Sequence, residues 1–347
     1  MRFEEILLGL SIGVCFCLSS ASSQLLLAQS RGGRQSPDYE IVEYQWENLW
    51  DPDSPDLQEW QILSRQINRI VSTPFGDLIL VDTDNYRLIR FTPQGEFIEI
   101  IGREGSGPGE FRQPIQIGFF PGSDTLWVMD QMLNRMQQFK VIQNQTQYLD
   151  STQLMGYRPS LHMDMKDNRC FVRFLPFNGR RIYEITLTGD VVRSFGEIIE
   201  PPYEVFSENE YNNGFIYIGQ NEEVLFIGAN MPLYERWSSQ GELLVSMQFP
   251  YPEIDPRPSP DLPRGSVPVV SQAAAYCASN DKLYHWTYGP QIYEVSPQTF
   301  RLERCFTFQG FDGFPSEALG IVLIDNEPQF YVYDVKTGGI VVIKKSQ

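Results

Sequence analysis

Two stretches of the sequence share one pattern, and this pattern decides the fold. The first, DLILVDTDNYRLIRFTPQGEFIEIIG, runs from Asp77 to Gly102, and the second, DTLWVMDQMLNRMQQFK, runs from Asp124 to Lys140. Each contains an alternating apolar strand that ends in Asp, a short polar turn, and a second strand with Arg near its start. Such internal similarity predicts an array of repeated supersecondary units.

Later parts of the sequence follow the same pattern more loosely, which brings the number of copies to six. The apolar residue before the second turn recurs at Phe91, Phe139, Ile185, Trp237, Val295 and Ile343. A period of about fifty residues is typical of a four-stranded propeller blade, and helical periodicity is nearly absent. We therefore predict an all-β fold, a six-bladed β-propeller of four-stranded antiparallel blades. The blades are expected near residues 65–111, 112–153, 157–199, 212–254, 270–309 and 317–347.

The two ends of the chain are expected to complete the last blade together. The sixth repeat has room for only three strands, whereas the stretch YEIVEYQW, from Tyr39 to Trp46, has β-propensity and no blade of its own. Pairing this orphan strand as the outer strand of the last blade would close the ring and satisfy backbone groups on an open edge.

The amino-terminal residues resemble a processing signal. Ile6 to Leu18 form an apolar run that is too short to span a bilayer, and small residues follow it. We predict a signal peptide over residues 1–21, cleaved after Ala21, and a flexible linker over 22–37. The mature protein would then be periplasmic or extracellular. Two alternatives are a lipoprotein modified at Cys15 or Cys17 and a retained N-terminal anchor, which would be the only contact with a membrane.

The composition excludes several classes of function. The net charge of −17 argues against a partner that is a nucleic acid, because such binding depends on neutralising phosphates. Only two histidines occur, so a zinc site with three imidazoles cannot form. The three cysteines of the predicted mature chain, Cys170, Cys277 and Cys305, are expected to be buried single thiols. We expect no cofactor.

The glycine-rich stretch GREGSGPGEF, from Gly102 to Phe111, resembles the linker between blades in the NHL-repeat family. The strand-turn-strand with Asp82, Asn85 and Arg87 resembles the other hallmark of that family, and the match extends over roughly residues 65–140. The layout is similar to the six-bladed, NHL-like propellers that bacteria export, most of which carry no assigned reaction. The stretch lacks the Lys-Ser/Thr of a phosphate loop, so we interpret its glycines as serving a tight passage between blades.

A propeller binds its ligands mainly at the mouth of the central channel. We expect this mouth where the inner strands begin and the loops between blades converge. The inner strands supply six candidate binding residues: Arg69, Gln116, His162, Asp164, Tyr217 and Gln272. His162 and Asp164 fall on the same face of one strand, where an imidazole beside a carboxylate could act as a general base or a ligand. A polar channel lining without chemistry is equally compatible with this spacing.

The family resemblance also implies an alternative function. Six-bladed relatives that act as lactonases or lyases hold a divalent cation on the propeller axis, and Asp164, Asn213 and Glu317 lie near inner-strand positions here. The proline-rich insert from Pro250 to Pro268 is expected to be a stiff loop that covers a channel mouth, meets a partner, or serves no function. No nucleophile–base pair, metal quartet or cofactor fingerprint stands out. The sequence favours an exported module that binds a protein, peptide or glycan without catalysis.

Overall fold

The structure is a computed structural model, and it describes most of the chain after residue 38. The described residues are 39–51, 53–54, 58–120, 122–154, 159–166, 169–174, 179–186, 188, 190–201, 207–249, 273–287, 290–311 and 315–346. The predicted signal peptide and linker, and the proline-rich insert, lie outside these residues.

Strands dominate the described residues, and they follow the predicted repeats in order. The first blade contains β2 (Ile67–Ser72), β3 (Leu78–Asp82), β4 (Arg87–Phe91) and β5 (Phe97–Ile101). The second contains β6 (Pro114–Phe119), β7 (Thr125–Asp130), β8 (Arg135–Ile142) and β9 (Gln145–Gln153). The third contains β10 (Pro159–Lys166), β11 (Arg169–Phe174), β12 (Arg180–Thr186) and β13 (Val191–Glu197).

The second half of the ring repeats this arrangement. The fourth blade contains β14 (Gly214–Ile218), β15 (Val224–Gly228), β16 (Leu233–Trp237) and β17 (Leu243–Gln248). The fifth contains β18 (Ala273–Cys277), β19 (Lys282–Trp286), β20 (Gln291–Val295) and β21 (Leu302–Phe308). The sixth contains β22 (Pro315–Ile324), β23 (Glu327–Asp334) and β24 (Gly339–Lys345), with β1 (Glu40–Trp50) beside β24.

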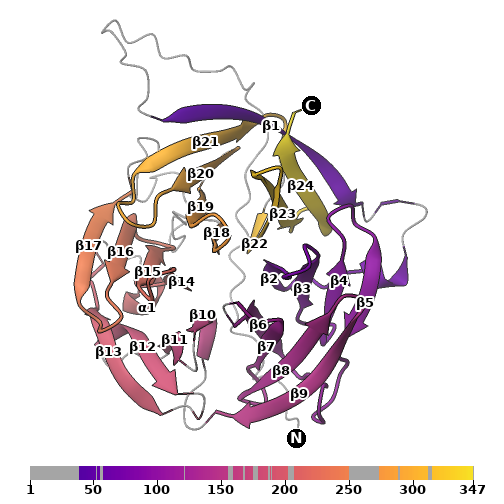
Figure 1. Cartoon of the computed structure of the whole chain (residues 1–347), viewed down its shortest axis with the longest axis horizontal. Helices are drawn as coiled ribbons and strands as arrows, with labels where there is room; N and C mark the ends of the chain where they lie inside the picture. The colour runs from indigo at the N-terminus through magenta and orange to yellow at the C-terminus, as the bar shows by residue number, and fades with distance from the viewer. Residues whose placement is uncertain are drawn as a thin grey trace, which may run out of the picture.

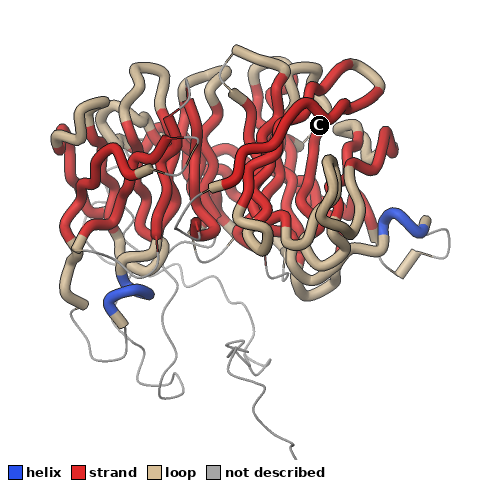
Figure 2. Tube along the Cα trace, turned by 90° about the horizontal axis from the view of Figure 1, so that it is seen from below, coloured by secondary structure: helices blue, strands red, loops and turns tan. Residues whose placement is uncertain are grey.

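The blades are arranged in a ring around a common centre. In Figure 1 the first strand of each blade faces the centre and the fourth strand forms the rim. Neighbouring strands within a blade are antiparallel. Figure 2 shows the ring from the side, with strands running between two faces that carry the turns. The second strands are buried on both faces because blades pack face to face, whereas rim strands such as β5 are half exposed.

The amino-terminal strand is the outer strand of the last blade, as its pattern predicted. Residues Tyr44 to Trp50 of β1 pair antiparallel with β24. The preceding residues, Glu40 to Tyr44, also pair with the rim strand β21 of the fifth blade, in parallel. The fifth and sixth blades are therefore joined in one eight-stranded sheet. The sequence pattern did not predict this second pairing.

Apolar clusters fill the spaces between blades. Among the described residues, six clusters lie one between each pair of neighbours around the ring. The cluster between the last and first blades joins Tyr331 and Val342 to Leu80 and Ile89. Each fully buried side chain of this kind contributes roughly 1.5–3 kcal/mol relative to leaving it exposed. The first and last blades are thus held by the same kind of packing as the others.

In each of the first two blades, the Asp at the end of the second strand accepts hydrogen bonds from the linker that leads into that blade. The buried carboxylate of Asp82 accepts a hydrogen bond from the Ser64 N–H at 2.9 Å, and others from Asn85 Nδ2 at 2.8 Å and Arg87 Nε at 2.9 Å. Asp130 accepts from the backbone N–H of Arg112 at 2.9 Å in the same way. These bonds account for the repeated Asp as a structural residue.

The glycine-rich stretch connects β5 to β6, as a linker between blades. Gly102 has φ +81°, and a Cβ there would lie 2.2 Å from Cε2 of the buried Phe111. Arg135 of the second blade donates hydrogen bonds to the carbonyls of Ser106, Gly107 and Glu110 at 2.7–2.9 Å. The backbone carbonyls of this stretch therefore accept hydrogen bonds from the protein itself. This agrees with the structural interpretation of its glycines.

Helix is confined to two short segments of the described chain. These are η1 (Glu59–Gln61), before β2, and α1 (Glu208–Tyr211), before β14. In Figure 2 both helical segments, drawn in blue, lie outside the body of strands. Neither segment has the length or apolar character required to cross a bilayer, and the remaining described residues contain no such helix either.

Candidate functional site

A cavity of about 910 Å³ lies at one mouth of the central channel. All six inner strands, β2, β6, β10, β14, β18 and β22, contribute residues to its lining. The turns that follow β2, β6 and β18 form part of its rim. The cavity is therefore at the end of the inner strands, and not at their beginning, where the blade linkers enter. This corrects the expected position of the mouth.

Two predicted residues meet inside this cavity from opposite sides of the ring. Arg69 belongs to β2 of the first blade and Tyr217 to β14 of the fourth, and Figure 1 shows these strands facing each other across the centre. Arg69 Nη1 donates a hydrogen bond to Tyr217 Oη at 3.1 Å. The guanidinium carbon also lies 5.0 Å from the centre of the tyrosine ring, within cation–π range. The pair forms a bridge across the channel.

The bridge is anchored to a third blade. The Tyr217 hydroxyl donates to the backbone carbonyl of Ala274 on β18, and the Tyr217 side chain is only 1% exposed. Its position is therefore fixed by packing and by a buried hydrogen bond, so Arg69 meets a rigid partner.

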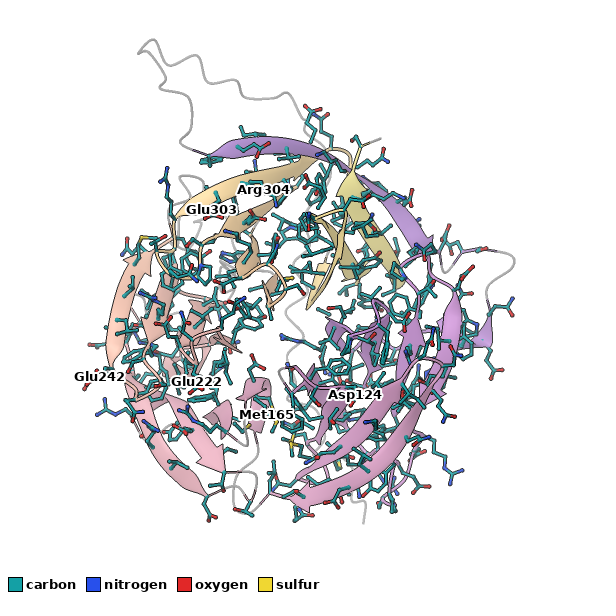
Figure 3. All side chains as sticks on the ribbon, in the orientation of Figure 1. Asp124, Met165, Glu222, Glu242, Glu303 and Arg304 are labelled. Atoms are coloured by element: carbon teal, nitrogen blue, oxygen red, sulfur yellow. The ribbon has the colours of Figure 1, made fainter. Side chains whose placement is uncertain are left out.

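Asp164 brings the third blade to the same cavity. Its Oδ2 accepts from the Ile218 N–H of β14 at 2.8 Å, and its Oδ1 accepts from the N–H of Met165, also at 2.8 Å. Burial raises the pKa of this carboxyl above its ordinary value, while the Ile218 N–H and the charge of Arg69 oppose that effect. In Figure 3, Met165 marks this part of β10 beside the open centre.

The rim carries polar residues that the sequence did not single out. Asp124 follows β6, is labelled in Figure 3, and forms an ion pair with Lys140 at 3.2 Å. Tyr276 donates from its hydroxyl to Asp281 at 2.6 Å. Cys277 also lines the cavity and is partly exposed, unlike the buried Cys170 and Cys305. The expectation of three buried thiols was therefore wrong for Cys277, because β18 ends at the cavity there.

The other predicted binding residues are not placed in this cavity. Gln116 lies on the inner strand β6 but is buried and does not line the cavity. His162 lies within β10, but its side chain is outside the described part of the structure, and Gln272 is outside it altogether. A role in binding stays a prediction for all six residues.

The residues considered for a metal site are dispersed or undescribed. Asn213 accepts a hydrogen bond from Arg173 and another from the Gly214 N–H at 3.0 Å. The side chain of Glu317 lies outside the described residues. Within the described chain, no group of three or more His, Cys, Asp and Glu side chains could hold a metal ion.

His285 is a buried group away from the cavity. It is fully buried on β19, and its Nδ1 lies 2.6 Å from the Tyr234 hydroxyl, so one of the two donates. The Phe249 ring packs against the imidazole with centroids 4.6 Å apart. Burial lowers the pKa of His285 to about 3, so the imidazole is neutral at physiological pH. Its surroundings indicate a structural role.

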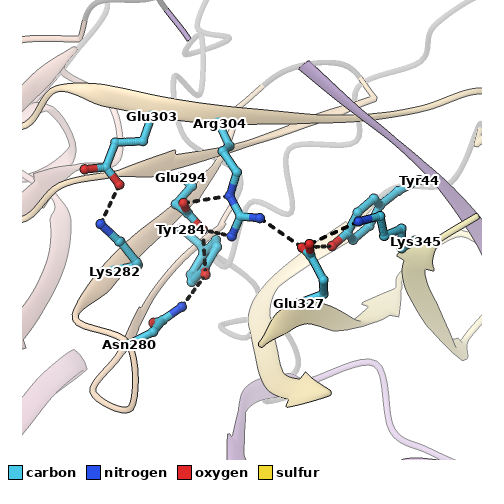
Figure 4. A network of polar contacts seen from close by, with 9 residues as sticks. All are labelled: Tyr44, Asn280, Lys282, Tyr284, Glu294, Glu303, Arg304, Glu327 and Lys345. Atoms are coloured by element: carbon cyan, nitrogen blue, oxygen red, sulfur yellow. Dashed lines mark hydrogen bonds and ion pairs between the residues drawn. The ribbon is translucent and has the colours of Figure 1, made fainter. Parts of the chain in front are cut away.

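A charged network holds the amino-terminal strand in place (Figure 4). Arg304 of β21 donates to Glu294 at 2.6–2.8 Å and to Glu327 at 2.9 Å. Glu327 also accepts from Lys345 at 3.1 Å and from the Tyr44 hydroxyl at 3.4 Å. The network connects β20, β21, β23, β24 and β1 at the junction of the last two blades, so it supports the fold and leaves the cavity untouched.

The comparisons with known proteins agree with this architecture. A family model described as a 6-bladed beta-propeller matches residues 61–174, which contain the first two blades and the start of the third. A search of the curated proteins found no match.

Several solved structures resemble the chain at low identity. Virginiamycin B lyase from Staphylococcus aureus is 12% identical, with 87% of this chain and 100% of that chain covered and a TM-score of 0.48. A streptogramin B lyase is 12% identical over 87% and 98%, also with a TM-score of 0.48. The Pan2 WD40 domain from Neurospora crassa is 10% identical over 81% and 75%, with a TM-score of 0.46. At these values the likeness says nothing about the chemistry of the cavity. The sheets, the repeat and the family match together identify the chain as a six-bladed β-propeller.

Proposed function

We propose that this propeller is a binding module that recognises a protein, peptide or glycan at the mouth of its channel, without catalysis. The observation that carries the proposal is the bridge from Arg69 to Tyr217, which places a charged floor in a cavity lined by every inner strand. A cavity of about 910 Å³ is within the range of sites that enclose small ligands.

The polar groups of the cavity are held in place before any ligand arrives. Asp164 is fixed by two backbone N–H groups, and Tyr217 by the carbonyl of Ala274. Fixed groups lower the entropy cost of binding, which favours recognition. Among the described lining residues, no hydroxyl or thiol stands within hydrogen-bond distance of a histidine that could activate it. This arrangement supports binding better than acyl transfer.

Binding arrays provide the test. The mature chain and its Tyr217→Phe variant are applied to glycan and peptide arrays, with Arg103→Gln as a matched surface control, since the Arg103 side chain is 81% exposed on a blade linker. We expect the mature chain and the control to retain one class of ligand that the Tyr217 variant binds more weakly. Release of a product from the retained ligand, dependent on a divalent cation, would contradict the proposal and favour a lactonase or lyase.

The proposal includes export from the cytoplasm. It is supported by the apolar run Ile6 to Leu18 and the small residues after it. Mass spectrometry of the protein recovered from the periplasm or medium should show an amino terminus after Ala21. Recovery of an intact chain that begins at Met1 in the cytoplasm would contradict export.

A further inference from the structure

We infer that the ligand of the channel cavity is an acidic saccharide whose carboxylate pairs with Arg69, an inference that rests on the proposed function. The starting observation is the charge of Arg69. No carboxylate among the described residues lies within 4.0 Å of its guanidinium, whereas the buried Arg90 and Arg181 both have one. Within the described chain, its guanidinium donates one hydrogen bond, to the neutral Tyr217 hydroxyl, and its buried Nε has no partner there.

The nearby carboxylates are engaged elsewhere. Asp164 accepts from the N–H groups of Met165 and Ile218, and Asp124 is paired with Lys140. A guanidinium can donate five hydrogen bonds in a planar fork that matches the geometry of a carboxylate. Among the described residues, Arg69 is therefore a cation of the cavity lining that makes no direct ion pair, because Asp164 acts on it only at longer range. A ligand carboxylate would supply a direct partner.

The walls of the cavity favour a saccharide over a peptide. The polar side chains around the floor end in hydroxyl or carboxylate oxygens, and they include Ser72, Ser123, Asp124, Asp164 and Ser279. Each hydroxyl or carboxylate oxygen has more than one acceptor position, so even a carboxylate that already accepts a hydrogen bond can accept another, and this lining complements a ligand rich in O–H donors. Sugars have a donor on nearly every carbon, whereas a peptide backbone presents equal numbers of donors and acceptors.

The ligand must also be short and carry few charges. The net charge of −17 repels a long polyanion, and this repulsion is screened beyond about 8 Å at physiological salt. The cavity, of about 910 Å³, encloses only a few sugar rings. An oligosaccharide with one acidic sugar among neutral ones satisfies both limits.

Calorimetric titration with three probes tests the inference. The first is a tetrasaccharide with one glucuronic acid and three neutral sugars, and the second is its carboxyl-reduced form. The third is a tetrapeptide with a free carboxyl terminus. We expect the acidic tetrasaccharide to bind roughly 10- to 100-fold more tightly than its reduced form, as a charge-assisted hydrogen bond requires. This comparison uses the unaltered protein and needs no variant.

Variants then locate the carboxylate. Arg69→Gln should remove the preference for the acidic form, and the exposed Arg103→Gln should keep it. Equal affinity for both saccharides, tighter binding of the peptide, or no binding of any probe would overturn the inference. The proposed function fails separately, when the arrays show no ligand whose binding depends on Tyr217.

Discussion

The indole Nε1 of Trp50 donates a hydrogen bond to the backbone carbonyl of Gly95 at 3.1 Å. Trp50 ends the strand that flanks the last blade, and Gly95 lies in the turn between β4 and β5 of the first blade. The amino-terminal strand therefore contacts three blades, through β21, β24 and this turn. The bond connects the two ends of the ring at its rim.

Replacing Trp50 should loosen this connection. The side chain is 2% exposed and packs 4.5 Å from the Phe91 ring, so Trp50→Ala should lower the free energy of unfolding by about 3–5 kcal/mol. Chemical denaturation of the mature chain measures this loss, and the exposed Asn48→Ala on the same strand is the control. A loss below 1 kcal/mol for Trp50→Ala would show that the strand does not hold the ring.

Two glycines with similar backbone angles should respond differently to substitution. Gly102 and Gly76 have φ of +81° and +88°, but only Gly102 lacks space, because a Cβ there would meet Phe111. Gly76→Ala should cost roughly 1–2 kcal/mol from the left-handed conformation alone. Gly102→Ala should cost about 1–3 kcal/mol more, from overpacking. Equal melting temperatures for the two variants would refute the tight linker passage.

His285 should remain neutral in acid. Burial lowers its pKa from the ordinary 6.5 of a histidine to about 3 in the folded protein, so the unfolded chain binds the extra proton between these values. Its contribution to stability is therefore complete above pH 6.5 and is lost as the pH falls toward 3. NMR of the imidazole signals, with His162→Asn to assign the two histidines, should show no His285 titration down to pH 4. A midpoint near 6.5 would contradict its burial.

Binding of an acidic ligand should weaken as the pH rises through the raised pKa of Asp164. Burial raises this pKa, whereas the N–H groups of Ile218 on β14 and Met165 on β10 and the charge of Arg69 on β2 lower it; the thiol that faces Asp164 is Cys170 of β11, whose own pKa burial and the carboxylate both raise. A protonated Asp164 does not repel a ligand carboxylate, so affinity should be highest below that pKa. Calorimetry across pH should show this fall, and Asp164→Asn should flatten it. An unchanged slope in the variant would exclude Asp164 as the titrating group.

The arrangement of blades could be predicted because it depends on local patterns. Alternating strands and the apolar residue before the second turn of each unit repeat along the chain, so their spacing gives the blade number. The parallel pairing of Glu40 with Arg304 in β21 has no sequence signature, because any exposed alternating strand can pair with the edge strand of a neighbouring sheet.

The cavity was only partly predictable from the sequence, for a related reason. Alternation along the inner strands indicated that Arg69, Asp164 and Tyr217 could face the channel. It could not indicate that Arg69 and Tyr217 meet across the ring, because this depends on the ring diameter. Asp124 and Tyr276 were missed because they lie at the ends of inner strands or in the turns after them, and the linker end was expected to form the mouth. The polar residues in the turns after the inner strands were the sequence signal that could have located the cavity at this end of the channel.

Cys277 allows the central claim, that the ligand occupies the channel cavity, to be tested directly. It lines the cavity and is partly exposed, whereas Cys170 and Cys305 are buried. Burial raises the pKa of the Cys277 thiol, so modification by N-ethylmaleimide is measured at alkaline pH. We predict that the array-selected ligand slows this modification and that the modified protein no longer binds it, whereas Cys277→Ser binds and is unaffected by the reagent. An unchanged rate at saturating ligand, together with full binding after modification, would contradict the claim.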